Sequence, residues 1–167
     1  MKIILETQRL ILREFLVTDA ENMFQLNSDP EVIRYTGDVP FASVEEAKRF
    51  IQQYDKYREF GYGRWTIVLK DSAQYVGWSG LSFDDNTTET DLGFRLLKKN
   101  WNKGFATEAA KDCLHYGFQQ LGLEKIIGRA MEDNKASIHI LKKVGMTFEK
   151  KFEAHGGACL QYFITKK

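Results

Sequence analysis

Residues 90–118, TDLGFRLLKKNWNKGFATEAAKDCLHYGF, form the stretch of sequence that decides the fold. The pattern predicts a strand, a short basic loop, and an amphipathic helix that begins after Gly104. A loop that opens directly into a helix leaves several backbone N–H groups unpaired and pointing in one direction. Because the helix N-terminus also carries partial positive charge, such a loop holds a phosphate without a dedicated side chain. Lys98, Lys99 and Lys103 add mobile positive charge, so we expect a pyrophosphate site here.

This loop alone does not decide the function, because an ordinary strand-to-helix turn with solvent-facing lysines has the same appearance. It is not a P-loop, since no Gly-Lys-Ser or Gly-Lys-Thr stands at the required spacing. It also holds too few glycines for a dinucleotide-binding fingerprint. The rest of the chain must therefore decide between a cofactor site and a plain turn.

Length and charge indicate one globular domain over residues 1–167. The 24 basic and 23 acidic side chains leave a net charge of +1, which argues against a general nucleic-acid binder. No segment approaches about 18 consecutive apolar residues, and the N-terminus lacks a signal-peptide layout. We therefore expect a soluble cytoplasmic protein that binds no membrane. Cys113 and Cys159 are interpreted as free buried thiols, and no ligand spacing indicates a metal.

The front of the chain predicts a strand and two helices. The strand is expected over 10–15. Thr18–Glu21 has the spacing of a capping box, and it starts a helix that ends near Asp29–Pro30. Ser43–Glu46 repeats that spacing and starts a second helix, which ends by Phe60–Gly61.

The middle of the chain predicts a β-hairpin over 64–70 and 75–83. Gly77 and Gly80 lie inside its second strand, where glycines weaken pairing and often mark the close approach of another group. Strands and helices alternate after the hairpin, so we expect a mixed α/β sheet. The later elements are expected as a helix from Gly104 to Gly122, a strand over 125–131, a helix over 134–144, and an antiparallel pair over 147–154 and 158–165.

Several ordered motifs resemble the GNAT family of acyl-CoA N-acyltransferases, in particular the subgroup that includes the ribosomal-protein N-terminal acetyltransferases. The loop and helix start read WNKGFATEA at 101–109, where typical members carry WGKGYATEA. Together the motifs cover essentially the whole chain, and several in order are more specific than any one. The further matching segments are LETQRLILR at 5–13, DPEV at 29–32, GWSG at 77–80, Gly93-Phe94, Asn134 with Ser137, and KVGM at 143–146.

The resemblance implies a GNAT fold with a mixed, mostly antiparallel sheet, splayed central strands and about four helices. It implies that acetyl-CoA is the cosubstrate and that an amine attacks the thioester directly in a ternary complex, with no metal. Backbone N–H groups of the loop would hold the pyrophosphate, and the end of the central strand would pair with the pantetheine arm. The residues expected to bind the cofactor are Leu96, Leu97, Asn102, Lys103, Gly104, Phe105, Ala106, Thr107, Asn134 and Ser137.

The sequence departs from the family pattern at two informative positions. Asn102 replaces the first glycine of the loop, which is tolerated because Asn accepts left-handed geometry. Leu141 stands where many members carry the tyrosine that protonates the leaving thiolate, so Ser137 becomes the nearest candidate acid. Its alternatives are a first-turn residue bonded to backbone, or a plain CoA contact. We interpret Glu108 as a first-turn charge that complements the helix dipole.

The general base is less well defined. Glu89 and Asp91 open the central strand, where other family members place a base, although charged residues at a strand end explain them equally well. Glu132 and Glu153 are weaker candidates. His155, beside a Gly-Gly turn, is the one histidine that we retain.

The acceptor side is expected to come from the two front helices and their loop, with Tyr35 and Trp78 as aromatic walls. For Trp65, which lies on an alternating face, a core position is favoured. The acceptor would be a primary amine, from a ribosomal or other protein N-terminus or a small molecule, and the protein a monomer or homodimer. Because Leu141 replaces the tyrosine, a non-catalytic acyl-CoA-binding sensor is the alternative function.

Overall fold

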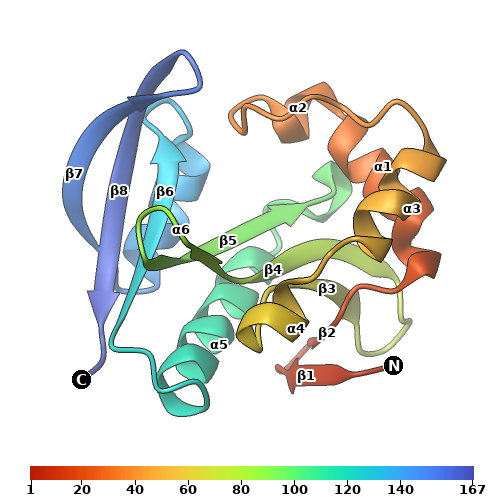
Figure 1. The fold of residues 1–167 in the computed structure, drawn as a ribbon, viewed down its shortest axis with the longest axis horizontal. Coiled ribbons are helices and arrows are strands. Elements are labelled where there is room, and N and C mark those ends of the chain that lie inside the picture. The colour runs from red at the N-terminus through yellow and green to blue at the C-terminus, as the bar shows by residue number, and fades with distance from the viewer.

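The computed structural model describes residues 1–167, which build one eight-stranded sheet with the strand order β1-β2-β3-β4-β5-β6-β8-β7 (Figure 1). Every neighbouring pair is antiparallel except β5 and β6, which are parallel. The expected GNAT sheet, mixed and mostly antiparallel, is confirmed. The strands are β1 (Ile3–Glu6), β2 (Leu10–Arg13), β3 (Arg64–Leu69), β4 (Tyr75–Asp84), β5 (Glu89–Leu96), β6 (Lys125–Met131), β7 (Thr147–Ala154) and β8 (Gly157–Thr165).

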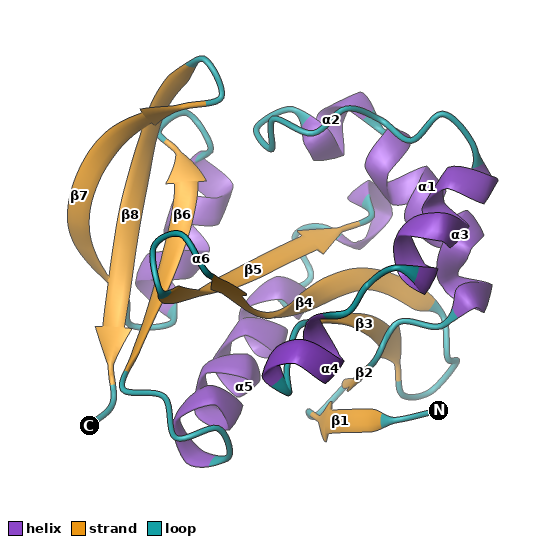
Figure 2. Ribbon diagram, in the orientation of Figure 1, coloured by secondary structure: helices purple, strands orange, loops and turns teal.

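Helices cover both faces of the sheet (Figure 2). Neighbouring residues of β3 show this division, because Trp65 packs edge-on against Tyr116 of α5 while Thr66 donates a hydrogen bond to Asp19 beside α1. Four longer helices match the expectation, and α2 and α4 are additional short turns. The helices are α1 (Ala20–Ser28), α2 (Pro30–Ile33), α3 (Val44–Gln52), α4 (Lys56–Phe60), α5 (Phe105–Gln119) and α6 (Lys135–Lys143).

The start of α1 differs from the prediction. The Thr18–Glu21 capping box does not form, because a 3-10 turn over 17–19 precedes the helix and no side chain caps it. The Asp19 carboxylate is instead buried and accepts two hydrogen bonds from the Arg13 guanidinium, from Nη1 and Nη2, each at 2.8 Å. The Ser43 cap at α3 does form, with its Oγ accepting the Glu46 N–H at 3.2 Å.

Two further bounds differ from the prediction. The long second helix is broken at Gln53–Asp55 into α3 and α4. The strand expected over 10–15 ends at Arg13, and a turn at Thr7–Arg9 separates it from β1, which was not predicted. The chain turns at both positions, and hydrophobic periodicity alone does not reveal either turn.

The predicted close approaches at the two glycines of β4 are present. A Cβ on Gly77 would lie 2.1 Å from the Arg95 carbonyl oxygen, and one on Gly80 would lie 2.3 Å from the Gly63 carbonyl oxygen. Any side chain at these positions would push β3 or β5 away from β4. The main core lies between the sheet and α5, and it includes Trp65, as predicted.

β5 and β6 part shortly after they meet. Their only paired residues are Asp91 and Ile127, near the start of each strand. Beyond that point the two strands diverge, so that β5 points toward α1 while β6 stays with β8 (Figure 1). The expected splaying of the central strands is therefore present, and it leaves one edge of β5 without a neighbouring strand.

Candidate active site

The edge of β5 that faces the opening is set by strand alternation. Leu97 donates its N–H to the Val76 carbonyl of β4 at 3.0 Å, and its carbonyl accepts the Asn100 N–H at 2.9 Å. Because backbone groups alternate along a strand, those of Phe94 and Leu96 point to the opposite edge, toward the opening. The Leu96 carbonyl accepts the Trp101 indole N–H at 3.0 Å. Both backbone groups of Leu97 are thus engaged within the chain, which counts against the prediction for this residue, whereas Phe94 and Leu96 face the opening.

The loop before α5 presents the predicted set of free donors. The backbone N–H groups of residues 102–107 donate to no other group of the chain. Asn102 and Gly104 both adopt left-handed backbone, with φ of 60° and 80°, which turns the loop sharply into the helix. Asn102 thus adopts the conformation for which relatives use glycine. The six-residue run, which we call the phosphate loop, has the donor geometry of an anion site.

Glu108 does more than complement the dipole of α5. Its carboxylate accepts the Thr7 hydroxyl at 2.6 Å, the Arg9 backbone N–H at 2.8 Å and the Arg9 Nε at 2.7 Å. Burial alone would raise the pKa of Glu108, but these hydrogen bonds and the guanidinium charge outweigh it and lower that pKa. Nothing in the sequence pattern connects positions so far apart in the chain, so sequence reasoning missed this contact.

Asn134 and Ser137 lie together at the start of α6, just beyond the end of β6. Asn134 caps the helix, because its side-chain oxygen accepts the Ser137 N–H at 3.2 Å. The half-buried Ser137 hydroxyl has no hydrogen-bond partner in the chain, so the backbone-bonded alternative does not hold for it. Leu141 is 1% exposed and packs on Gly128 of β6, so this position offers no hydroxyl to the opening.

The two carboxylates predicted as bases are both paired. Asp91 accepts two hydrogen bonds from the Arg64 guanidinium, at 3.0 and 3.2 Å. Glu89 lies two residues earlier in β5, toward the closed end, where β5 and β6 still lie together. Its carboxylate oxygens lie 3.6 Å from Lys125 Nζ and 3.8 Å from Arg129 Nη2. Glu89 also lines a cavity of about 290 Å³ at that end. Asp91 is therefore nearer than Glu89 to the point where the strands part.

The weaker base candidates lie on the far side of the opening. Glu132 pairs with Lys151 at 3.3 Å, whereas Glu153 makes no ion pair. His155 has backbone φ of 55° at the turn between β7 and β8. It touches the loop between α2 and α3, since a Cβ on Gly37 would lie 2.2 Å from its Nδ1. The turn between β7 and β8 thus meets the loop after α2 across the opening between β5 and β6.

The acceptor-side residues come together through Arg95 of β5. Trp78 lies between two guanidinium groups, with Arg64 at 5.2 Å and Arg95 at 5.3 Å from its ring centre. Arg95 also pairs with Asp38 at 2.8 Å, and Asp38 lies on the same loop as Tyr35. This ion pair thus ties the loop that carries Tyr35 to β5 beside Trp78, and neither Arg64 nor Arg95 was anticipated from the sequence.

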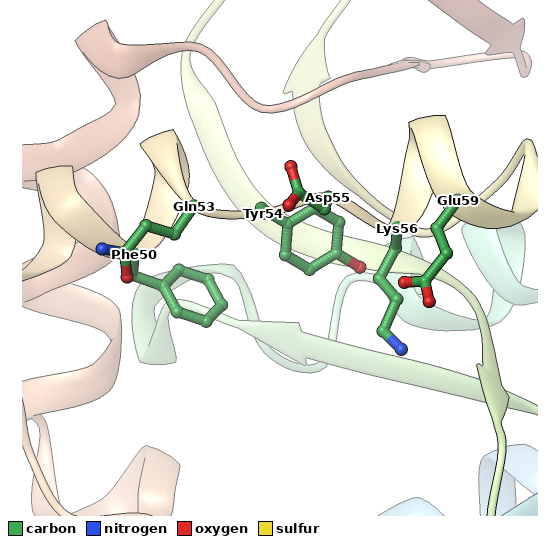
Figure 3. A pocket seen from close by; sticks show the side chains of 6 residues that line it. All are labelled: Phe50, Gln53, Tyr54, Asp55, Lys56 and Glu59. Atoms are coloured by element: carbon green, nitrogen blue, oxygen red, sulfur yellow. The ribbon is translucent and has the colours of Figure 1, made fainter.

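A larger groove, of about 430 Å³, lies outside this region. Figure 3 shows its lining, which comes from the end of α3, the link that follows and α4. None of its residues belongs to β5, to the phosphate loop or to α6. It therefore lies apart from the phosphate loop and the edge of β5, on the second of the two front helices that were expected on the acceptor side. The lining residues are Phe50, Gln53, Tyr54, Asp55, Lys56 and Glu59.

Three further features of the structure concern metal ions, membranes and disulfides. No cluster of three or more His, Cys, Asp or Glu side chains is placed to hold a metal ion. None of the helices combines the length and apolar character that crossing a membrane requires. Both cysteines are free and buried.

Comparison with known proteins agrees with this geometry. The Acetyltransferase (GNAT) domain family matches residues 9–147. The uncharacterized N-acetyltransferase YoaA of Bacillus subtilis (strain 168) is 36% identical over 150 residues, which cover 89% of this chain and 84% of that protein. The crystal structure of a GNAT-family acetyltransferase from Bacillus anthracis is 27% identical, with a TM-score of 0.84 over 98% of each chain.

The fold is also that of a ribosomal-protein acetyltransferase. RimL, described as a ribosomal L7/L12 alpha-N-protein acetyltransferase and solved in complex with coenzyme A, superposes with a TM-score of 0.81. The match covers 98% of each chain at 15% identity, so it shows the fold alone. From the family match and the similarity to YoaA together, we conclude that this chain belongs to the GNAT family and is an N-acetyltransferase.

Proposed function

We propose that the chain, acting as one domain over residues 1–167, transfers the acetyl group of acetyl-CoA to a primary amine in a ternary complex. The observation that carries this proposal is the run of free N–H groups in the phosphate loop at the end of a strand whose neighbour has parted. A pyrophosphate on the loop would leave the pantetheine arm running along the open edge of β5.

The cofactor would be held mostly by backbone. The N–H groups of Asn102, Lys103, Gly104, Phe105, Ala106 and Thr107 would bind the pyrophosphate. Phe94 and Leu96 would pair with the amides of the pantetheine arm, as an added strand would. The Asn134 Nδ2 donates to no group of the chain, so it can bind the arm beyond β6.

The chemistry needs little from the protein besides position. The amine nitrogen attacks the thioester carbonyl, a C–N bond forms, and collapse of the tetrahedral intermediate breaks the C–S bond. The leaving thiolate then takes a proton, and we assign that proton to the free Ser137 hydroxyl. With Leu141 buried in the core, no other hydroxyl on the inner turn of α6 is available for this role.

The attacking amine must lose a proton, and Asp91 is the proposed acceptor ahead of Glu89. Asp91 lies at the last point where β5 and β6 pair, whereas Glu89 is deeper in the closed end. Arg64 occupies the Asp91 carboxylate, so a water molecule would relay the proton. Asp91→Asn should therefore lower kcat more than Glu89→Gln does, with both variants measured in the same assay.

The acceptor is proposed to be an N-terminal α-amine of a ribosomal or other protein, with a small-molecule amine as the second class. The resemblance of the sequence motifs to the ribosomal-protein subgroup supports the first class. The charged side chains around Trp78 are already paired, which favours an uncharged peptide end over a polycation.

Thiol release from acetyl-CoA, measured across a panel of N-terminal peptides and small amines, tests the proposal. We expect amine-dependent release of CoA with a subset of the panel. CoA binding without turnover on any amine would contradict it and favour an acyl-CoA sensor instead.

A further inference from the structure

Arg9 reaches from the turn between β1 and β2 to the phosphate loop. Its Nη1 donates to the Lys103 carbonyl oxygen at 3.0 Å, and its guanidinium carbon lies 4.5 Å from the centre of the Phe105 ring. A Cβ on Gly104 would lie 3.3 Å from Arg9 Nη2. The guanidinium therefore contacts three consecutive residues of the loop, although it is nearly a hundred positions away in sequence.

The bond to Lys103 fixes the direction of a donor. The peptide group between Lys103 and Gly104 is planar and trans, so its C=O and N–H point in opposite directions. Arg9 holds the C=O toward the turn between β1 and β2, which directs the Gly104 N–H away from Arg9 and leaves it without a partner in the chain. A charged donor on the carbonyl also polarises the peptide, which makes its N–H a stronger donor.

Arg9 is itself held in place by Glu108 and Thr7. Glu108 accepts both the backbone N–H and the side-chain Nε of Arg9, at 2.8 and 2.7 Å. Thr7 donates its hydroxyl to Glu108 and accepts the Leu10 N–H at 3.0 Å. The guanidinium is thereby fixed at both ends, by a carboxylate of α5 and by a carbonyl of the loop.

We propose that Arg9 is a positioning residue for acetyl-CoA, which orients the phosphate loop through the Lys103 carbonyl and acts on the bound diphosphate through the Gly104 N–H. The inference rests on the proposed acetyl-CoA site and assigns to the turn between β1 and β2 a part in it. Because this role acts through the loop and not on the acetyl group, removal of Arg9 should weaken the binding of the diphosphate and leave the chemistry at the thioester unaltered.

The test compares Arg9→Ala and Arg9→Lys with Lys70→Ala in the full chain. Lys70 pairs with Glu6 at 3.4 Å at the same end of the sheet and carries the same charge, but it does not touch the loop. We expect Arg9→Ala to raise the KM for acetyl-CoA about fivefold, the effect of one weakened hydrogen bond, with kcat unchanged. Arg9→Lys should raise the KM for acetyl-CoA by a similar factor, since an ammonium cannot bridge Glu108 and Lys103 as a guanidinium does. Lys70→Ala should match the unaltered chain.

A second donor separates positioning from general stability. Acetyl-pantetheine carries the same thioester but no diphosphate and no nucleotide. We expect its kcat/KM to be the same for Arg9→Ala and the unaltered chain, because nothing in it meets the phosphate loop. Circular dichroism and the thermal midpoint of each variant establish that it is folded at the assay temperature.

Three outcomes would overturn the inference. An unchanged KM for acetyl-CoA in Arg9→Ala would show that the loop needs no such support. An equal loss with both donors would assign Arg9 to the stability of the fold. Full activity of Arg9→Lys would show that charge alone matters. If the unaltered chain releases no CoA with any amine, the proposed function fails. The three outcomes above apply only to an active unaltered chain, so failure of the inference alone is distinguishable from failure of the proposed function.

Discussion

At the start of α5 the polar groups without partners are backbone N–H groups, whereas across the sheet Arg13, Arg64 and Arg95 each have a carboxylate partner. The first region, which we call the cofactor side, is built from one loop and one strand edge. The second, the acceptor side, is built from β2 to β5, the loop after α2 and the first helices (Figure 1). The cofactor side therefore leaves donors free for a ligand, while the acceptor side satisfies its own charges.

The two sides are therefore suited to different kinds of ligand. Backbone donors at a helix start suit any molecule with a diphosphate, and the same geometry serves a whole family. Paired side chains recognise shape and the positions of a few groups, and they change from one protein to the next. The cofactor can therefore be inferred from the loop, while the acceptor has to be found by experiment.

The largest expected effect is on the stability of the acceptor side. Asp19→Ala leaves Arg13, whose side chain is 9% exposed, without its carboxylate, and leaves Thr66 without its acceptor. Breaking such a buried pair should lower the free energy of unfolding by about 3–5 kcal/mol, measured by urea denaturation. Asp55→Ala breaks an exposed pair with Arg58 and should cost less than about 1 kcal/mol. A similar loss in both variants would contradict the assignment of a buried network.

The next effect concerns catalysis on the cofactor side. Ser137→Ala should lower kcat about 100-fold, a typical contribution of general acid catalysis, with little change in the KM for acetyl-CoA. Ser137→Thr keeps a hydroxyl and should retain most of the activity. If instead KM rises while kcat is preserved, Ser137 is a cofactor contact and the thiolate takes its proton from water.

The third effect separates the phosphate loop from backbone strain. Gly104→Val should weaken CoA binding at least tenfold, roughly 1.4 kcal/mol, because a branched side chain disfavours left-handed backbone and displaces the donors. Gly122→Val is the matched control, since Gly122 has φ of 68° with open space around it at the far end of α5. Isothermal titration calorimetry with CoA measures both. Equal CoA affinity in the two variants would place the phosphate site elsewhere.

The smallest effect probes the acceptor side alone. Asp38→Asn removes the partner of Arg95, and because Asp38 is about half exposed the stability should fall by less than about 1 kcal/mol. The KM for the acceptor amine should change about twofold to threefold, since the loop that carries Tyr35 loses its anchor. The KM for acetyl-CoA should stay constant. A change confined to acetyl-CoA would reverse the division into two sides.

The fold could be predicted further than the site. The bounds of β6 and β7 agree with the prediction, and α6 agrees within one residue at each end. The helix α5 begins one residue after Gly104 and ends three residues before Gly122. Strong apolar periods and glycine stops account for this agreement. The break between α3 and α4 was missed, since Gln53–Asp55 carries no glycine or proline. The first capping box did not form because residues 17–19 adopt a 3-10 turn, in which the Asp19 carboxylate accepts the Leu16 N–H and also binds Arg13 and Thr66.

Within the site, local features were readable and distant contacts were not. The left-handed backbone at Asn102 agrees with the expectation that Asn accepts this geometry. The cap at Asn134 was not predicted, although Asn is a common N-cap residue. The prediction placed the backbone groups of the consecutive residues Leu96 and Leu97 at one site, although alternation directs them to opposite edges of the strand. The hydrogen bond from Leu97 to Val76 shows which of the two edges meets β4. The partners of Arg9, Asp91 and Arg95 lie on other elements, and no pattern along the chain marks them.

The most direct test of the central claim, that backbone donors of the phosphate loop bind the cofactor, is an NMR titration of the ¹⁵N-labelled chain with CoA. The account predicts that the amide proton shifts of residues 103–107 change most, moving downfield as each N–H gains a charged acceptor. Phe94 and Leu96 should follow as the pantetheine arm pairs with β5. Largest shifts at α3 and α4, around the groove lined by Phe50 and Tyr54, with the loop unchanged, would contradict it.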